Sequence, residues 1–502
     1  MENKIRLRLS LYGIISAISY IYLILTPNPG ISIPMFFIIQ IVSLYLIVKG
    51  KPEVKNIKGL LLMIPIFIIS LNHFISANNL WRPTNFLAVV FLYSVMFLML
   101  NDKLELKRLN IYGILKAVVN VFEPLINFIV PFKWIAERSK NKEKNILVKR
   151  ILLGIAISIP CVLFLVTMLS SADMVFYNNF VSFNKWFADL FNFFHILKII
   201  MGAFTGLYLF GHLYSVFAEN DNSIVNLADK SPFSAKQVKG DVIVLNILMV
   251  SILIIYTIFI AIQFKYLFSS GELPYGLNYA EYARRGFFEL VFLSVLNIAL
   301  ILLTTYLLKD KIYGEKNIWS SATRIMLIYL CIITGIMLVS SYYRMSLYDS
   351  AYGFTRLRVL VYMFLIFEGL GLASTLIYII KHNFNILAVY AAVGLAFYLT
   401  LNLVKIDEII AERNIDMYFA GQTESLDMDY LMSLSADAAP HIMRLMDKEV
   451  EIITRNKARV YMEGLNELYA KSEYDWRNYN LSVEKTKELL LTNSDKLEFK
   501  YD

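Results

Sequence analysis

The sequence lacks most of what a soluble enzyme or a disulfide-bonded domain requires. Its two cysteines, Cys161 and Cys331, both lie in apolar segments, so neither a disulfide framework nor a zinc site is expected. The five histidines are scattered, and no pair has metal-ligand spacing on a helix. Phosphate loops, nucleophile elbows and glycine-rich dinucleotide fingerprints are also missing. We therefore predict no catalytic residue, no metal and no cofactor, and we lean away from an enzyme.

Charge is also scarce. Only 18% of the 502 residues are charged while 58% are hydrophobic, which is outside the usual range of soluble domains. Eleven apolar stretches approach the roughly 20 residues that a helix needs to cross a bilayer. We predict an all-α, polytopic transmembrane helical bundle of about 11 spans with a small helical C-terminal extramembrane domain. The predicted spans are 9–26, 32–48, 59–77, 84–101, 151–170, 195–217, 241–268, 286–308, 322–343, 357–380 and 384–404.

The charges that are present are unevenly distributed. Residues 1–404 carry 35 basic and 20 acidic side chains, whereas residues 405–502 carry 13 basic and 20 acidic ones. Within 1–404, Lys and Arg are concentrated in alternate loops, and short loops rich in these residues mark the cytoplasmic side. The N-terminus is therefore expected in the cytoplasm, and eleven crossings place the acidic C-terminal region outside. Orientation explains the basic excess better than nucleic-acid binding does.

Charge and hydropathy together divide the chain into four regions. A basic, amphipathic segment interrupts the series of spans, and an acidic, hydrophilic region follows it. We expect membrane lipids as partners, an envelope or sensor protein as a further partner, and no nucleic acid. The predicted regions are 1–108 (four membrane helices), 109–150 (amphipathic and basic, cytoplasmic), 151–404 (a membrane core of about seven helices) and 405–502 (an acidic helical domain on the extracytoplasmic side).

Two helical patterns carry specific expectations. Lys116, Asn120, Glu123 and Asn127 form one polar stripe on the otherwise apolar stretch 109–137. This stretch is expected to lie in the inner membrane interface or to pack under the bundle. In the C-terminal region, the stretch 449–470 has an apolar face, which is expected to pack against other short helices. The residues of that face are Ile452, Ile453, Val460, Leu465 and Leu468.

Ionisable side chains in or beside spans are the strongest chemical signal, because each costs roughly 2.5–3.5 kcal/mol at the centre of a bilayer. Most of these side chains gather at the predicted outer ends of spans. Arginine offers a fork of donors that suits phosphate or carboxylate, so the cluster is a candidate site for an anionic head group. The alternative is that arginines and acids only tie helix ends together, with tyrosines as an interfacial belt. The predicted ligand-binding residues are Asp173, Glu281, Tyr282, Arg284, Arg285, Arg344, Tyr348, Asp349 and Arg356.

Glu368 differs from these residues because it lies several turns inside its span. Gly369 and Gly371 flank it. A carboxyl group at this depth is a candidate for carrying a proton or an ion.

Several of these segments resemble a known family. The resemblance runs from about residue 150 to the C-terminus, and YAEYARRGFFEL (279–290) is its most specific part. The chain resembles the bacterial membrane family catalogued as domain of unknown function 4173. The resemblance implies an uncharacterised polytopic protein of the inner membrane and no specific activity. The other segments that carry it are SSADMVF (170–176), RMSLYDSAYGFTRLRV (344–359), IDEIIAERNI (406–415), LDMDYLMSLSADAAP (426–440) and DWRNYNLS (475–482).

Three functions remain open at this point. The first is a non-enzymatic envelope protein of the bacterial plasma membrane that binds a lipid head group, an envelope precursor or a partner protein at the outer cluster. Its acidic C-terminal region would dock over the arginines. The second is a secondary transporter with Glu368 and Asp173 in its path, although no inverted repeat is visible. The third is a membrane enzyme acting on a lipid-linked substrate.

Overall fold

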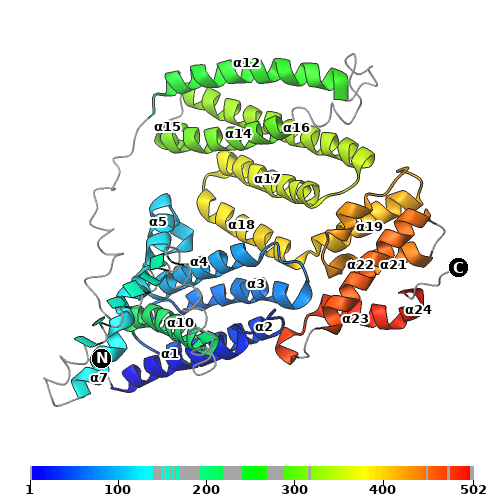
Figure 1. Ribbon diagram of the computed structural model, residues 1–502. Helices are drawn as coiled ribbons and strands as arrows, with labels where there is room; N and C mark the ends of the chain where they lie inside the picture. Colours follow the sequence, from blue (N-terminus) through cyan, green and yellow to red (C-terminus); the bar gives the residue numbers. More distant parts are fainter. Residues whose placement is uncertain are drawn as a thin grey trace. The chain divides into compact units, whose positions relative to one another are not determined.

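The computed structural model describes most of the chain, and all regular secondary structure within the described ranges is helical. The chain divides into two compact units, whose helices are shown in Figure 1. Unit 1 comprises residues 1–63, 88–103 and 115–229, and unit 2 comprises residues 64–87, 104–114 and 230–502. The described ranges are 3–138, 150–151, 193–218, 240–267, 287–314, 318–447, 450–471 and 475–497, with single residues and pairs between 153 and 173.

Unit 1 is built around the contact of α1 with α10. The two helices approach closely because small residues face each other: a Cβ added to Gly206 would lie 2.4 Å from the Gly13 oxygen and 2.8 Å from the Ala17 Cβ. The helices of this unit are α1 (Asn3–Leu23), α2 (Ser32–Val48), η1 (Ile57–Leu62), α4 (Arg82–Leu100, from residue 88), α5 (Ile111–Asn120, from residue 115), α6 (Glu123–Ile126), η3 (Asn127–Ile129), α7 (Val130–Arg138) and α10 (Phe193–Phe217).

The predicted amphipathic stretch is the interrupted series from α5 to α7, and its polar stripe faces the protein. All four residues of the stripe are buried. The side-chain amide of Asn120 donates to the Ser94 carbonyl at 3.1 Å, and that of Asn127 donates to the Gly211 carbonyl at 3.1 Å. Apolar side chains such as Ile129 are exposed on the outer side. This arrangement suits a surface covered by lipid, because a helix facing water would turn its polar stripe outward.

In unit 2, four long helices form the membrane core. α14 and α17 pack on α16, and α12 packs on its other side (Figure 1). α16 has 35 residues and is therefore about 52 Å long, well beyond the roughly 30 Å of a hydrocarbon core. The membrane helices and their connections are α3 (Met63–Ile75), η2 (Leu106–Arg108), α12 (Val242–Leu267), α14 (Phe287–Leu307), α15 (Lys309–Gly314), α16 (Ile318–Tyr352), α17 (Arg356–Lys381) and α18 (Ile386–Leu403).

Residues 405–502, called the tail below, continue unit 2 as short helices, as predicted. Their apolar core also includes Val359 of α17, and Phe354 and Met363 pack against it. The tail therefore shares a core with the membrane helices. Its helices are α19 (Ile406–Phe419), α20 (Met428–Met432), η4 (Ala436–Ala438), α21 (Ala439–Asp447), α22 (Ile452–Ala470), η5 (Trp476–Asn478), α23 (Leu481–Thr492) and α24 (Ser494–Leu497).

The predicted apolar face of α22 is wrong. Ile452, Ile453, Val460 and Leu468 are all exposed, and Leu465 is the one predicted residue that packs partly against the core. The buried face consists of Thr454, Ala458, Tyr461 and Met462. This face packs closely on neighbouring helices and carries a small residue, Ala458, and residues with hydroxyl groups, Thr454 and Tyr461. A prediction from hydrophobicity alone therefore assigned the buried face to the wrong side of α22.

The predicted series of spans agrees with the helices. Within the described ranges, nine helical segments are long and apolar enough to cross a membrane, and α1 and α2 coincide with two more predicted spans. One of the nine is 111–135, which is interrupted between α5 and α7. The predicted span 151–170 lies largely outside the described residues. The chain is a multi-pass integral membrane protein.

Candidate functional site

The connection between α16 and α17 brings together several residues of the predicted outer cluster. Asp349 falls between the predicted spans 322–343 and 357–380, but it lies in the last turns of α16, because that helix continues to Tyr352. The turn itself is 353–355 and begins at Gly353, whose φ of +71° favours glycine.

Asn414 of α19 fixes the conformation of this turn. Its side-chain oxygen accepts the Phe354 N–H at 2.6 Å, and its side-chain nitrogen donates to the Phe354 carbonyl at 2.9 Å. A Cβ added to Gly353 would lie 2.8 Å from the same side-chain oxygen. The tail therefore determines the shape of the turn, since Asn414 satisfies both backbone groups of Phe354.

Arg358 is the central cation of the turn. Its Nε lies 3.6 Å from Asp349 Oδ1, and one terminal nitrogen donates to the Gly353 carbonyl. Its guanidinium carbon lies 4.2 Å from the centre of the Tyr348 ring, within the range of a cation–π interaction. Tyr348, Asp349, Gly353 and Arg358 are called the turn cluster below. It places a positive charge against an aromatic face and beside a buried carboxylate.

A cavity of about 360 Å³ opens beside the turn cluster. It combines one arginine and one tyrosine with an otherwise mostly apolar wall, which is the usual make-up of a small-molecule pocket. The wall comes from the first turn of α14, the last turns of α16 and the start of α17. The lining residues are Phe287, Phe288, Met345, Tyr348, Thr355, Leu357, Arg358 and Val361.

Arg356 has a different role, because it binds the tail. Its Nε and one terminal nitrogen donate to the two oxygens of Asp407, both at 2.7 Å. The Asp407 side chain is 0% exposed and also accepts the Ser435 N–H at 2.9 Å. The Tyr430 hydroxyl accepts the Arg356 N–H at 2.7 Å, and burial raises the pKa of this phenol, which keeps it neutral. Paired donors of this kind form strong, geometrically specific ion pairs.

Further tail residues close the end of α3. The Asn480 side chain donates to the carbonyls of His73 and Ser76 at 2.9 and 2.8 Å, so it satisfies groups that the helix end leaves open. Asp437 accepts the Ser76 hydroxyl and, at 2.9 Å, the Ala77 N–H. These contacts attach the tail to a second membrane helix.

The other predicted ligand residues are distributed differently. Arg344 is buried in α16, about one turn before Tyr348 of the turn cluster. Asp173 is exposed, lies in unit 1, and donates its N–H to the Leu169 carbonyl at 3.1 Å. Glu281, Tyr282, Arg284 and Arg285 lie outside the described residues and directly precede Phe287 in the sequence. Their assignment to the site stays a prediction.

Glu368 is buried in the membrane core of unit 2, with 4% of its surface exposed. Its Oε1 accepts the Ser294 hydroxyl of α14 at 2.5 Å, and its Oε2 has no hydrogen-bond partner within the part of the chain that the structure describes. A polar layer continues through Asn297, which donates to Thr334 at 3.1 Å and accepts the Tyr256 hydroxyl at 2.9 Å. Four membrane helices thus contribute polar groups around one carboxyl group.

The predicted ligand residues include Arg356 but not Arg358, the central cation of the turn cluster. Sequence reasoning also missed the residues that hold the tail: Asp407, Asn414, Tyr430, Asp437 and Asn480. All five lie in segments that carried the family resemblance. Those segments were therefore a usable signal, although their chemistry points to docking of the tail.

Comparison with known proteins places the chain in a family. The profile of the family described as Domain of unknown function (DUF4153) matches residues 63–445, more than half of the chain. This corrects the predicted resemblance, which named a differently numbered family of unknown function and began near residue 150. No curated protein and no solved structure gives a significant match. The chain belongs to the DUF4153 family and is an integral membrane protein of that family.

Proposed function

We propose that the protein is a non-enzymatic binding protein of the bacterial plasma membrane that holds an anionic, amphipathic molecule in the cavity beside the turn cluster. The ligand class is a lipid head group or a lipid-linked envelope precursor. The observation that carries this proposal is the Arg358 guanidinium held against Tyr348 in a cavity with apolar walls.

Arg358 keeps donors available for such a ligand. A guanidinium has five N–H donors, and the contacts with Asp349 and Gly353 use Nε and one terminal nitrogen. The second terminal nitrogen of Arg358 makes no hydrogen bond to any of the residues that the structure describes. Phe288 and Leu357 are exposed beside it and offer apolar surface to an acyl or prenyl chain. In the sequence, Arg284 and Arg285 precede Phe287 and would add positive charge.

The orientation of the chain is part of this proposal. The segment 111–135 is broken into helices of ten residues or fewer, so no single helix there covers roughly 30 Å. Counting it as a re-entrant or interfacial segment preserves eleven crossings and keeps the basic loops on one side. The N-terminus then lies in the cytoplasm, and the tail and the turn cluster lie outside.

The proposal is tested by the lipid content of protein purified in mild detergent, measured by native mass spectrometry. Arg358→Gln should lower retention of a phosphorus-containing amphiphile about 10- to 100-fold, the usual worth of a hydrogen bond to a charged group. Tyr348→Leu should weaken retention while keeping apolar volume. Arg324→Gln is the matched control, because Arg324 lies in α16 far from the cavity and donates to the Ile380 carbonyl.

Equal retention in Arg358→Gln and Arg324→Gln would refute the lipid site. Loss of a co-purifying protein in Arg358→Gln, with lipid content unchanged, would replace the lipid by a protein partner. Hydrogen exchange of the α19 amides reports whether the tail is still attached, and it serves as the check that each variant is folded.

A second candidate function rests on Glu368. A buried carboxyl group with one oxygen unbonded among the described residues suits a proton or cation carrier in the membrane. The test is proton-driven solute uptake by reconstituted vesicles. Loss of uptake in Glu368→Gln would support a transporter if uptake is retained in the control Glu289→Gln, which changes an acidic residue in the first turn of the neighbouring α14. Identical fluxes in the two variants and the unchanged protein would exclude this role for Glu368.

A further inference from the structure

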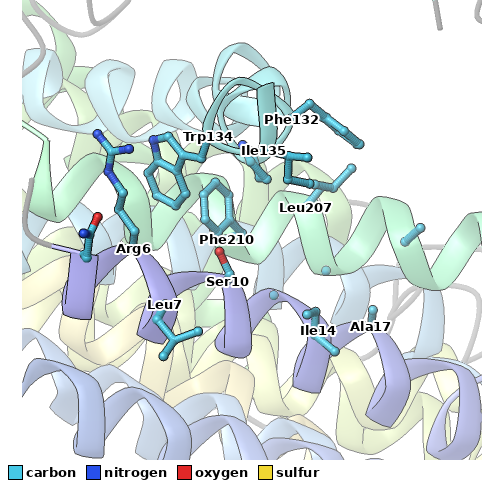
Figure 2. A pocket seen from close by; sticks show the side chains of 15 residues that line it. Arg6, Leu7, Ser10, Ile14, Ala17, Phe132, Trp134, Ile135, Leu207 and Phe210 are labelled. Carbon is cyan, nitrogen blue, oxygen red and sulfur yellow. The ribbon is translucent and has the colours of Figure 1, made fainter. Parts of the chain in front are cut away.

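Unit 1 contains a separate groove, formed where α7 crosses the pair α1 and α10 (Figure 2). Its volume is about 750 Å³, within the range of lipid-sized and drug-sized sites. Trp134 of α7 packs edge-to-face on Phe210 and Tyr214 of α10, with ring centres 5.6 and 5.8 Å apart. These ring contacts hold α7 in place as one wall of the groove.

The groove is polar at one end and apolar along the rest of its length. Asn3, Arg6 and Ser10 lie at the polar end, near the start of α1. Figure 2 shows the Arg6 side chain extending alongside the Trp134 ring, and its guanidinium carbon lies 5.4 Å from the ring centre. The apolar part runs past Ile14 and Ala17 of α1 and past Leu207 of α10.

Charge and shape favour one occupant. None of the fifteen residues that line the groove is acidic, and Lys4 adds exposed positive charge beside Arg6 in the first turn of α1. Basic residues next to a membrane attract anionic lipid with about 1 kcal/mol each. The small residues Gly13, Ala17 and Gly206 bring the helix backbones together and leave a shallow floor on which an acyl chain can lie.

We propose that this groove binds one anionic phospholipid, with its phosphate at Arg6 and Ser10 and one acyl chain along the apolar part. The site belongs to unit 1 alone and does not depend on the proposed function of the turn cluster. An arginine held against an indole ring is pre-oriented for a phosphate, because the ring limits the freedom of the guanidinium.

The test uses the full chain reconstituted in nanodiscs that contain phosphatidylglycerol, phosphatidylcholine or both, followed by extraction into detergent and native mass spectrometry. One phosphatidylglycerol should remain bound in preference to phosphatidylcholine. Arg6→Gln should lower this retention about tenfold or more, since it removes a charged hydrogen-bond donor. Ala203→Leu should lower it by filling the groove from its exposed side.

Arg8→Gln is the matched control, because Arg8 is exposed on the same helix and does not line the groove. It should retain the lipid. Equal retention of both lipids, or unchanged retention in Arg6→Gln and Ala203→Leu, would overturn the proposal. So would a change from dimer to monomer in Ala203→Leu without loss of lipid, since the occupant would then be a second copy of the chain.

Discussion

The ion pair between Arg356 and Asp407 should dominate the attachment of the tail, and Asp407→Asn tests this. The substitution keeps the shape but replaces two charge-assisted hydrogen bonds at 2.7 Å by weaker contacts and turns an amide N–H₂ toward the guanidinium. Removing one partner of a fully buried pair costs about 3–5 kcal/mol. Because the Arg356 side chain is 33% exposed and can reach solvent, we expect a smaller loss, about 2–3 kcal/mol.

A loss of this size should increase local opening of the tail about 30- to 150-fold, which hydrogen exchange of the α19 to α23 amides measures. The matched control is Asp416→Asn on the same helix, because Asp416 binds Arg444 at 2.7 Å but both side chains are more than a third exposed. An exposed pair contributes less than about 1 kcal/mol. If the two variants open the tail equally, the buried pair does not hold it and the reasoning is wrong.

Three further predictions concern the same region. Gly353→Ala should lower the melting temperature more than Gly421→Ala. Both residues have positive φ, so each substitution should cost about 1–2 kcal/mol of backbone strain. Only at Gly353 would the added Cβ also meet a neighbouring side chain, that of Asn414. Asn480→Ala should cost about 2–4 kcal/mol in chemical denaturation, since it removes the cap of α23 and the hydrogen bonds to the His73 carbonyl in α3 and the Ser76 carbonyl just after it. Burial raises the pKa of Tyr469 from 10.0 to about 12. Between about pH 10 and 12 the phenol therefore keeps its proton in the folded tail and loses it in the unfolded chain, so the stability of the fold should decrease over this range. Tyr469→Phe should make this fall in stability smaller, as measured by the fluorescence change on unfolding of the tail at each pH. An unchanged pH profile would contradict the assignment of the fall to Tyr469.

The spans could be predicted because a bilayer imposes one requirement on length and one on hydropathy. The same rule could not give the length of α16. Its last turns carry polar residues and continue past the predicted end at residue 343 to Tyr352, and the turn that follows them is held by Asn414 of the tail. The polar stripe of 109–137 was recognised, but its direction was not, because amphipathicity alone does not say whether lipid or water lies opposite the stripe.

The candidate site was predicted in part for a similar reason. Costly charges near spans predicted Asp349 and Arg356 as site residues from the sequence alone, but not Arg358, the central cation of the turn cluster. Their partners could not be identified, since Asp407 and Asn414 lie about 50–60 residues further along the chain and have no periodic relation to the turn. The cavity could not be foreseen either, because its walls come from three different helices.

Side-specific labelling tests the central claim, that the turn cluster and the docked tail face the outside of the cell. In a chain with Cys161 and Cys331 replaced by serine, Glu424→Cys marks an exposed tail position and Lys55→Cys marks an exposed position in a basic loop. A membrane-impermeant maleimide added to intact spheroplasts should label the tail position at once and the loop position only after permeabilisation. The reverse pattern would place the tail in the cytoplasm and contradict an envelope ligand at the turn cluster.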